Sequence, residues 1–214
     1  TLWGLRLTYN FSRHGAFTIR FWEGTEDYRW AVLRKKPEFQ PKWKWTLFNL
    51  FFICGYQQIL ILLFTLPIIL ALQFNDTPFG IWDIIASIAM LFFIIYEAVA
   101  DNQHWKFQSA KWKKIKNKEK LEGEFKKGFL DKGLWGFSRH PNYFAEQSLW
   151  LSFYLFSIIA SGEWLNWSIA GGLLLVVLFQ GSSNFSEEIS AEKYPLYKEY
   201  QKKVPRFFGW KKSK

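Results

Sequence analysis

Long apolar stretches alternate with charged ones along this chain, and the apolar stretches are long enough to cross a membrane. The clearest runs from Thr46 to Asn75 and contains no charged residue. Roughly 20 apolar residues cross a bilayer core as a helix, so this stretch suffices even with a kink at Pro67. The pattern predicts three further spans, over about residues 81–100, 143–161 and 165–185.

The segment before the first span has a weaker pattern. Residues 1–22 are only half apolar, because cationic side chains such as Arg6 and Arg13 interrupt them. We expect the partial end of a membrane helix there, followed by an interfacial helix. Residues 24–34 are predicted to form a polar loop with a short helix, which the prolines at 37 and 41 then end.

Composition supports a membrane protein. Of the 214 residues, 50% are hydrophobic and 21% aromatic, with 13 Trp. A formal charge of +10 is also found in nucleic-acid-binding proteins. Here Lys and Arg flank the apolar runs and do not form a basic surface on one side of the fold, so no nucleic-acid partner is expected. The single Cys54 lies inside an apolar run, which excludes an internal disulfide and leaves the compartment undetermined.

The basic residues orient the predicted bundle. Residues 29–44 hold six Lys or Arg, residues 106–139 hold eleven and residues 193–214 hold eight. The turns near residues 75–80 and 162–166 hold none. This alternation is the positive-inside pattern, so we expect the basic loops and the C-terminal tail on the cytosolic or matrix side. Residues 111–127 are predicted to be a lysine-rich linker near acidic headgroups.

Two groups of polar residues flank the second and third spans. Arg139 and His140 stand before Pro141, which suits a helix start, and the free N–H groups of that start make it an anion site. Asn142 and Glu146 share one face of the same helix. At the end of the second span a single helical face carries four more polar residues, namely Glu97, Asp101, His104 and Gln108.

Each group has a simpler explanation beside the functional one. Arg139 and His140 would serve equally at an interfacial helix start that faces lipid headgroups. Carboxylates near a membrane boundary usually pair or bind something, and Glu97 and Asp101 could simply pair with nearby lysines. A third group lies in the tail and includes Glu188 and Tyr194, where the alternative is a solvated amphipathic helix.

Three blocks of sequence carry a family resemblance. Residues 97–107 (EAVADNQHWKF), 133–146 (GLWGFSRHPNYFAE) and the tail from Glu188 to Trp210 resemble the bacterial-type membrane family related to steroid 5-alpha-reductase. Residues 24–34 (GTEDYRWAVLR) also fit, so the resemblance covers nearly all of the chain. It implies one all-α domain, a polytopic transmembrane helix bundle over residues 1–214 with about four full spans and a shortened N-terminal part.

The resemblance implies an NADPH-dependent reductase that transfers hydride to a lipophilic enone, steroid- or isoprenoid-like, within the membrane. The cofactor-binding residues it implies are Asp101, Arg139, His140, Asn142, Tyr143, Glu146, Glu188 and Tyr194. The sequence departs from the family at the carbonyl-activating acid pair. Its Glu would precede Thr1, and Trp3, which cannot act as an acid, stands near the Tyr position.

Two other functions fit the sequence. The Arg-His-Pro-x-Tyr motif and the tail, with its Val204–Pro205 ending, also resemble the isoprenylcysteine carboxyl methyltransferases, which would make S-adenosylmethionine the cofactor. The third function is an accessory subunit of a larger membrane complex that keeps the fold without the reaction. Membrane lipids are expected partners in every case. The charge pattern fits the endoplasmic reticulum, the mitochondrial inner membrane and the bacterial inner membrane alike. The sequence does not identify the substrate.

Overall fold

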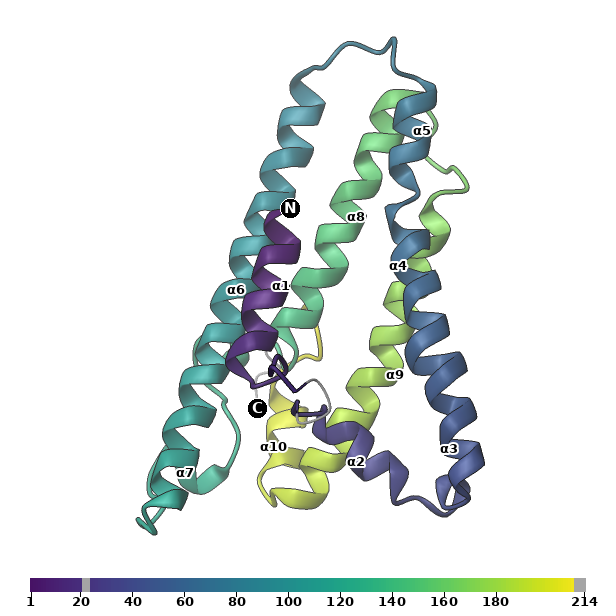
Figure 1. Cartoon of the computed structure of the whole chain (residues 1–214). Coiled ribbons are helices and arrows are strands. Elements are labelled where there is room, and N and C mark those ends of the chain that lie inside the picture. The colour runs from purple at the N-terminus through teal and green to yellow at the C-terminus, as the bar shows by residue number, and fades with distance from the viewer. Residues whose placement is uncertain (21–23, 210–214) are drawn as a thin grey trace.

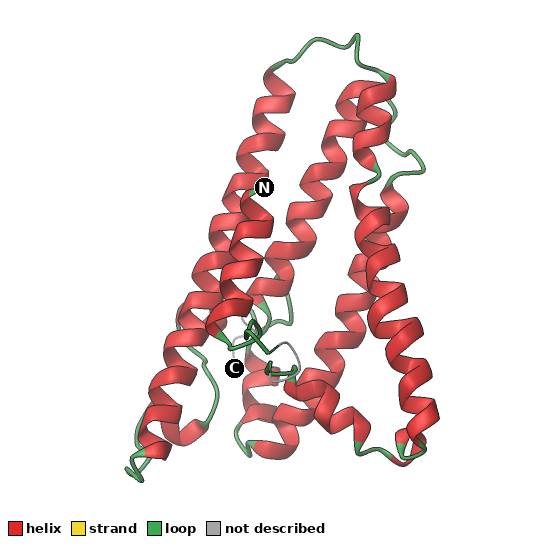
Figure 2. Cartoon of the chain, in the orientation of Figure 1, coloured by secondary structure: helices red, strands yellow, loops and turns green. Residues whose placement is uncertain are grey.

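Helices account for all the regular structure in residues 1–20 and 24–209, the part of the chain that the computed structural model describes (Figures 1 and 2). The predicted all-α helix bundle is therefore confirmed. Some residues of the sequence patterns above lie outside the described part, namely Phe21, Trp22, Trp210 and the last three lysines of the basic tail, Lys211, Lys212 and Lys214.

The N-terminal third forms two short helices and one long helix that is broken into segments. Helix α1 spans Leu2–Arg13, and α2 spans Tyr28–Arg34, as expected for the polar loop. After a turn of 3₁₀-helix the chain rises continuously through four helical segments. These are α3 (Lys42–Phe48), the π-helix η3 (Asn49–Tyr56), α4 (Gln57–Thr65) and α5 (Pro67–Gln73).

The remaining elements are α6 (Ile81–Lys116), α7 (Glu124–Lys127), the 3₁₀ turn η4 (Gly133–Gly136), α8 (Pro141–Ser161), α9 (Ile169–Lys193) and α10 (Tyr197–Lys203). Their boundaries follow local chemistry. Pro141 occupies the first turn of α8, and Gly162 ends it with a left-handed φ of 75°. At the start of α6 the Gly80 N–H donates to the Asp83 carboxylate over 2.9 Å.

Helix α6 is longer than the apolar pattern predicted. The predicted span ended at Ala100, whereas the helix continues to Lys116 because nothing in the polar stretch that follows breaks a helix. The prediction that residues 111–127 form a linker is therefore wrong for its first part. Lys111 is only 5% exposed, and its Nζ donates to the Gly128 carbonyl oxygen over 2.8 Å.

Within the described part of the chain, three helical segments are long and apolar enough to span a membrane, at Lys42–Gln73, Ile81–Lys116 and Ile169–Lys193. Helix α8 packs against α5, α6 and α9 in the middle of the bundle, carries buried polar side chains such as Gln147 and Ser152, and is not among these three segments. The number of spans therefore stays a prediction. The two tight turns lie at one end of the bundle, while α2, α7 and α10 lie at the other (Figure 1).

The apolar core forms where α4, α8 and α9 meet. Leu60 and Phe64 of α4 pack with Trp150 of α8 and Leu175 of α9, and Trp3 of α1 covers them. The crossing of α4 and α9 is close because Gly171 faces the α4 backbone. A Cβ at Gly171 would lie 2.2 Å from the Leu63 carbonyl carbon, so any side chain would push these two helices apart.

This close approach gives a stability prediction with a neighbouring control. Gly171→Ala should lower the free energy of unfolding by about 1–3 kcal/mol despite the better helix propensity of Ala. Gly172→Ala should be neutral or slightly stabilising, since its Cβ would meet only the Leu151 Cδ2 atom at 3.4 Å. Thermal unfolding of both variants in detergent measures the difference. Equal melting temperatures would contradict the α4–α9 packing.

Candidate functional site

A buried arginine connects α1 to α6 and α8. Arg6 Nη1 lies 2.8 Å from Glu97 Oε1 and 2.8 Å from Asp101 Oδ2, and its Nη2 lies 3.3 Å from Glu146 Oε2. The four side chains are 8–13% exposed. We call these residues the Arg6 cluster. It brings one positive charge together with three carboxyl groups inside the bundle.

Neutral donors complete the shell around two of the carboxylates. The Trp3 indole N–H lies 2.8 and 3.0 Å from the two Glu146 oxygens, and the Trp150 indole donates to Oε1 over 2.9 Å. The Asn142 amide donates to Asp101 Oδ1 over 3.2 Å. Trp3, which stands where the family resemblance suggests a Tyr, therefore acts as a hydrogen-bond donor to Glu146.

Two buried polar atoms of the Arg6 cluster have no hydrogen-bond partner among the described residues. They are Arg6 Nε and Glu97 Oε2. Leaving a buried donor or acceptor unpaired costs about 1–3 kcal/mol, so such atoms are rare unless a ligand, a proton or water satisfies them. The cluster thus has spare hydrogen-bonding capacity at its centre.

The Arg6 cluster contains two of the predicted cofactor residues, Asp101 and Glu146, and a third, Asn142, donates to Asp101. The lysine-pairing alternative is wrong, because the partner of Glu97 and Asp101 is Arg6. His104 and Gln108, predicted on the same helical face, make a separate contact, with 3.3 Å between His104 Nε2 and Gln108 Nε2. The sequence patterns did not single out Arg6, although a cation in a half-apolar stretch is itself a signal of function.

A second ionic cluster forms around Glu187 of α9. Arg139 donates to the Glu187 carboxylate from Nε over 2.8 Å and from Nη2 over 3.2 Å. His140 Nε2 lies 2.9 Å from Oε1, and Gln201 Nε2 donates to Oε2 over 2.7 Å. We call these four residues the Glu187 cluster. The anion beside the predicted α8 helix start is therefore a carboxylate of the chain itself.

The Glu187 cluster fastens the C-terminal tail to the chain before α8. Arg139 Nη1 donates to the Gln201 carbonyl oxygen over 2.8 Å. Two backbone N–H groups, of Arg139 and His140, donate to the carbonyl oxygens of Pro205 and Arg206 over 2.9 and 3.0 Å. Burial lowers the pKa of His140 despite its contact with Glu187, and Arg139 lowers it further. At neutral pH His140 is therefore a neutral donor.

The other predicted residues lie around these two clusters. The Tyr143 hydroxyl oxygen accepts a hydrogen bond from Arg29 Nη1 over 2.8 Å, and the Tyr143 ring stacks on His140 with 5.1 Å between centroids. Tyr194 lies elsewhere, with its hydroxyl 3.4 Å from Lys111 Nζ. Glu188 is exposed and borders a cavity, and it is its neighbour Glu187 that binds Arg139.

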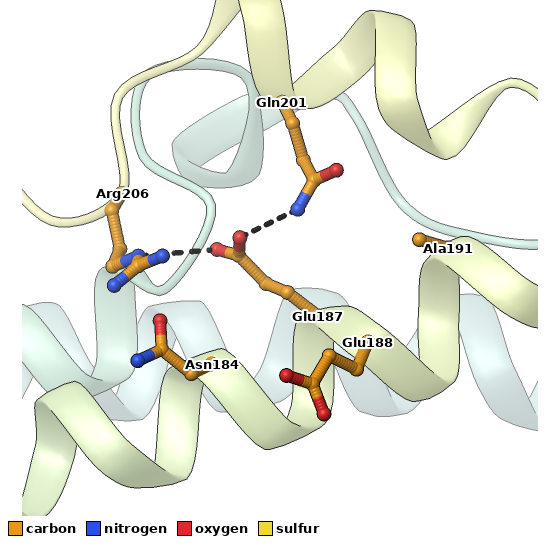
Figure 3. Close-up of a pocket in the computed structure, with 6 residues that line it drawn as sticks. All are labelled: Asn184, Glu187, Glu188, Ala191, Gln201 and Arg206. Carbon is orange, nitrogen blue, oxygen red and sulfur yellow. Dashed lines mark hydrogen bonds and ion pairs between the residues drawn. The ribbon is translucent and has the colours of Figure 1, made fainter.

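The cavity beside the Glu187 cluster has a volume of about 260 Å³ and lies between α9 and the C-terminal segment. Figure 3 shows Gln201 and Arg206 pointing from that segment toward Glu187. Its lining carries two carboxylates, two amides and one guanidinium, from Asn184, Glu187, Glu188, Ala191, Gln201 and Arg206. This cavity is therefore polar and of mixed charge.

The fold and these clusters define a helical membrane protein with two buried ionic clusters. Residues 1–204 match the family described as "Protein of unknown function (DUF1295)", and the chain belongs to that family. A protein of Schizosaccharomyces pombe, "Uncharacterized protein C594.04c", is 44% identical over 216 residues, which cover 97% of this chain and 60% of the relative. The chain thus spans about 60% of that relative's length. No solved structure matches the chain.

The contrast between two adjacent glutamates gives the next prediction. Glu187→Ala should destabilise the protein by about 3–5 kcal/mol, because it leaves Arg139 buried without its carboxylate. It should also expose residues 197–206 to proteolysis. Glu188→Ala should change the stability by about 0.5 kcal/mol or less, as expected of an exposed side chain. Limited proteolysis and thermal unfolding measure both effects, and similar behaviour of the two variants would contradict the role of Glu187.

Proposed function

We propose that this domain is an NADPH-dependent reductase that reduces the carbon–carbon double bond of a lipophilic enone within the membrane. The observation that carries the proposal is the convergence of Asp101 with Asn142 and Glu146 around Arg6. Two of the sequence blocks that resemble steroid 5-alpha-reductases contribute to this one buried cluster, although they are about 40 residues apart.

The Arg6 cluster suits the nicotinamide riboside half of NADPH. The ribose hydroxyls and the carboxamide N–H₂ are donors, for which carboxylates are the natural acceptors, and Asn142 offers both a donor and an acceptor. The unpaired Arg6 Nε and Glu97 Oε2 are polar atoms that the folded chain itself leaves open. The residues present therefore fit this part of the cofactor.

The phosphates need cations whose charge is not already neutralised. Arg139 is bound to Glu187, so its charge is largely used within the fold. Arg13 donates to the amide oxygens of Asn10 and Asn102, which are neutral and leave its charge available. Arg206 also pairs with Glu187, with 3.6 Å between Nε and Oε1. We therefore assign Arg13 as a phosphate-binding cation.

Bound NADPH would supply the hydride, and the protein must stabilise the negative charge that grows on the carbonyl oxygen of the enone. Donors that are already oriented in a water-poor site do this most effectively. The Arg6 Nε–H, which has no partner among the described residues, is such a donor. Trp3 cannot transfer a proton, and its N–H is already bound to Glu146. The long helices expose apolar side chains, and a lipophilic substrate would enter from lipid across these faces.

Two alternatives each have one observation in their favour. Three carboxyl groups face one guanidinium, and this excess of negative charge suits the sulfonium and ammonium groups of S-adenosylmethionine, as in a methyltransferase acting on a lipid or isoprenylcysteine. The Trp3 indole N–H donates to both Glu146 oxygens, and the cavity described above lies beside Glu187, not at Arg6. That arrangement suits an accessory subunit of a larger membrane complex in which the site is closed.

Calorimetric titration of the detergent-purified protein with NADPH, and in parallel with S-adenosylmethionine, tests the proposal. We expect saturable binding of NADPH alone. Asn142→Ala should weaken it about tenfold or more, which corresponds to about 1.4 kcal/mol for a lost hydrogen bond in a buried site. Asn184→Ala, which removes an exposed amide from the cavity beside Glu187, is the matched control and should bind NADPH like the unaltered protein.

Other results would select between the alternatives. Binding of S-adenosylmethionine alone would favour methyl transfer, and the absence of binding by either cofactor in folded protein would favour the accessory subunit. If NADPH binds and folded Asn142→Ala binds it equally well, the Arg6 cluster is not the cofactor site.

A further inference from the structure

The carboxyl groups of Glu97 and Glu146 receive very different numbers of hydrogen bonds. Both oxygens of Glu146 accept from N–H groups, supplied by Trp3, Trp150 and Arg6. Glu97 Oε1 faces only Arg6, and Glu97 Oε2 faces no donor among the described residues. The two carboxyl groups nevertheless contact the same guanidinium, Glu97 at Nη1 and Glu146 at Nη2 of Arg6.

Three ionised carboxylates around one buried guanidinium would leave negative charge that neither a cation nor water compensates. A proton held by one of them removes part of this repulsion. Glu146 is the better anion, since N–H donors from three residues surround it. Asp101 is likewise an anion, held by Arg6 and Asn142. The proton therefore belongs on Glu97.

We propose that Glu97 is a neutral, proton-carrying acid in the middle of this membrane domain, and that its Oε2 proton is the one consumed when an enone is reduced there. The groups that face it are Arg6 from α1, Asp101 from its own helix and Glu146 from α8. The second half of the proposal rests on the proposed reductase function. The first half does not.

The proton completes the chemistry of the proposed reduction. Hydride adds two electrons and one hydrogen to the β-carbon of the enone, which becomes an enolate while the nicotinamide is oxidised. The Glu97 O–H bond then breaks, its proton joins the enolate, and the saturated ketone leaves. Glu97 is left as a carboxylate beside the Arg6 guanidinium, which stabilises it until a proton from water at the basic end of the bundle restores the acid.

Infrared spectroscopy of the protein in lipid nanodiscs tests the first half directly. A protonated carboxyl group has a C=O stretch separate from that of a carboxylate, and it shifts in deuterated water. We expect this band at neutral pH in the unaltered protein and its loss in Glu97→Gln, which replaces one neutral group by another of the same shape. Glu97→Gln should therefore also fold normally, while Glu146→Gln should be destabilised because the anion is removed from its N–H donors.

Either the absence of the band at neutral pH or its persistence in folded Glu97→Gln would overturn the assignment. The second half is tested by turnover. Glu97→Gln should still bind NADPH, because its amide offers a donor and an acceptor in place of the neutral acid, while turnover falls at least about 100-fold, as is usual when a general acid is removed. Normal turnover in Glu97→Gln would refute proton delivery. If the band is lost in Glu97→Gln and the unaltered protein does not bind NADPH, Glu97 is the neutral acid but the proposed reductase function is wrong.

Discussion

The contact between Arg6 and the carboxyl groups of α6 and α8 is the interaction on which the rest of the structure depends. Charged groups in a membrane domain are costly to bury, and each persists only where a partner compensates for the lost water. Arg6 is that partner for Glu97, Asp101 and Glu146 at once. The same contact holds the short helix α1 against the bundle, where Trp3 reaches the apolar core formed by α4, α8 and α9.

The start of α8 takes part in both ionic clusters. Arg139 and His140, before the helix, bind Glu187 and the C-terminal tail. Asn142 and Glu146, within its first two turns, point instead to the Arg6 cluster. The turn at Pro141 separates these two directions. This arrangement explains why so many polar residues are crowded into eight positions, and it fixes the tail relative to the proposed cofactor site.

The sequence predicted the positions of the long apolar helices well, because charge-free stretches of this length have few other uses. It could not predict how far α6 continues, since hydropathy reports the part of a helix that contacts lipid and says nothing about its extension into water. The same limit explains Lys111, which charge alone suggested would be solvated. Its burial depends on contacts with Gly128 and Tyr194, which are far away in the sequence.

The candidate site was predicted in part for a similar reason. Helical spacing placed Asn142 and Glu146 on one face, and the structure shows both reaching the Arg6 cluster. Spacing could not identify their partner on α1, because a tertiary contact leaves no periodic trace. It also could not choose between Glu187 and Glu188, whose side chains point about 100° apart on the same helix. Only the packing of the tail makes Glu187 the buried one.

An experimental structure of the protein in lipid with NADPH present would locate the cofactor directly. We expect the nicotinamide riboside next to Asp101, Asn142 and Glu146, with a phosphate near Arg13. A cofactor bound only in the cavity bordered by Asn184 and Glu188, with the Arg6 cluster unchanged, would contradict this expectation.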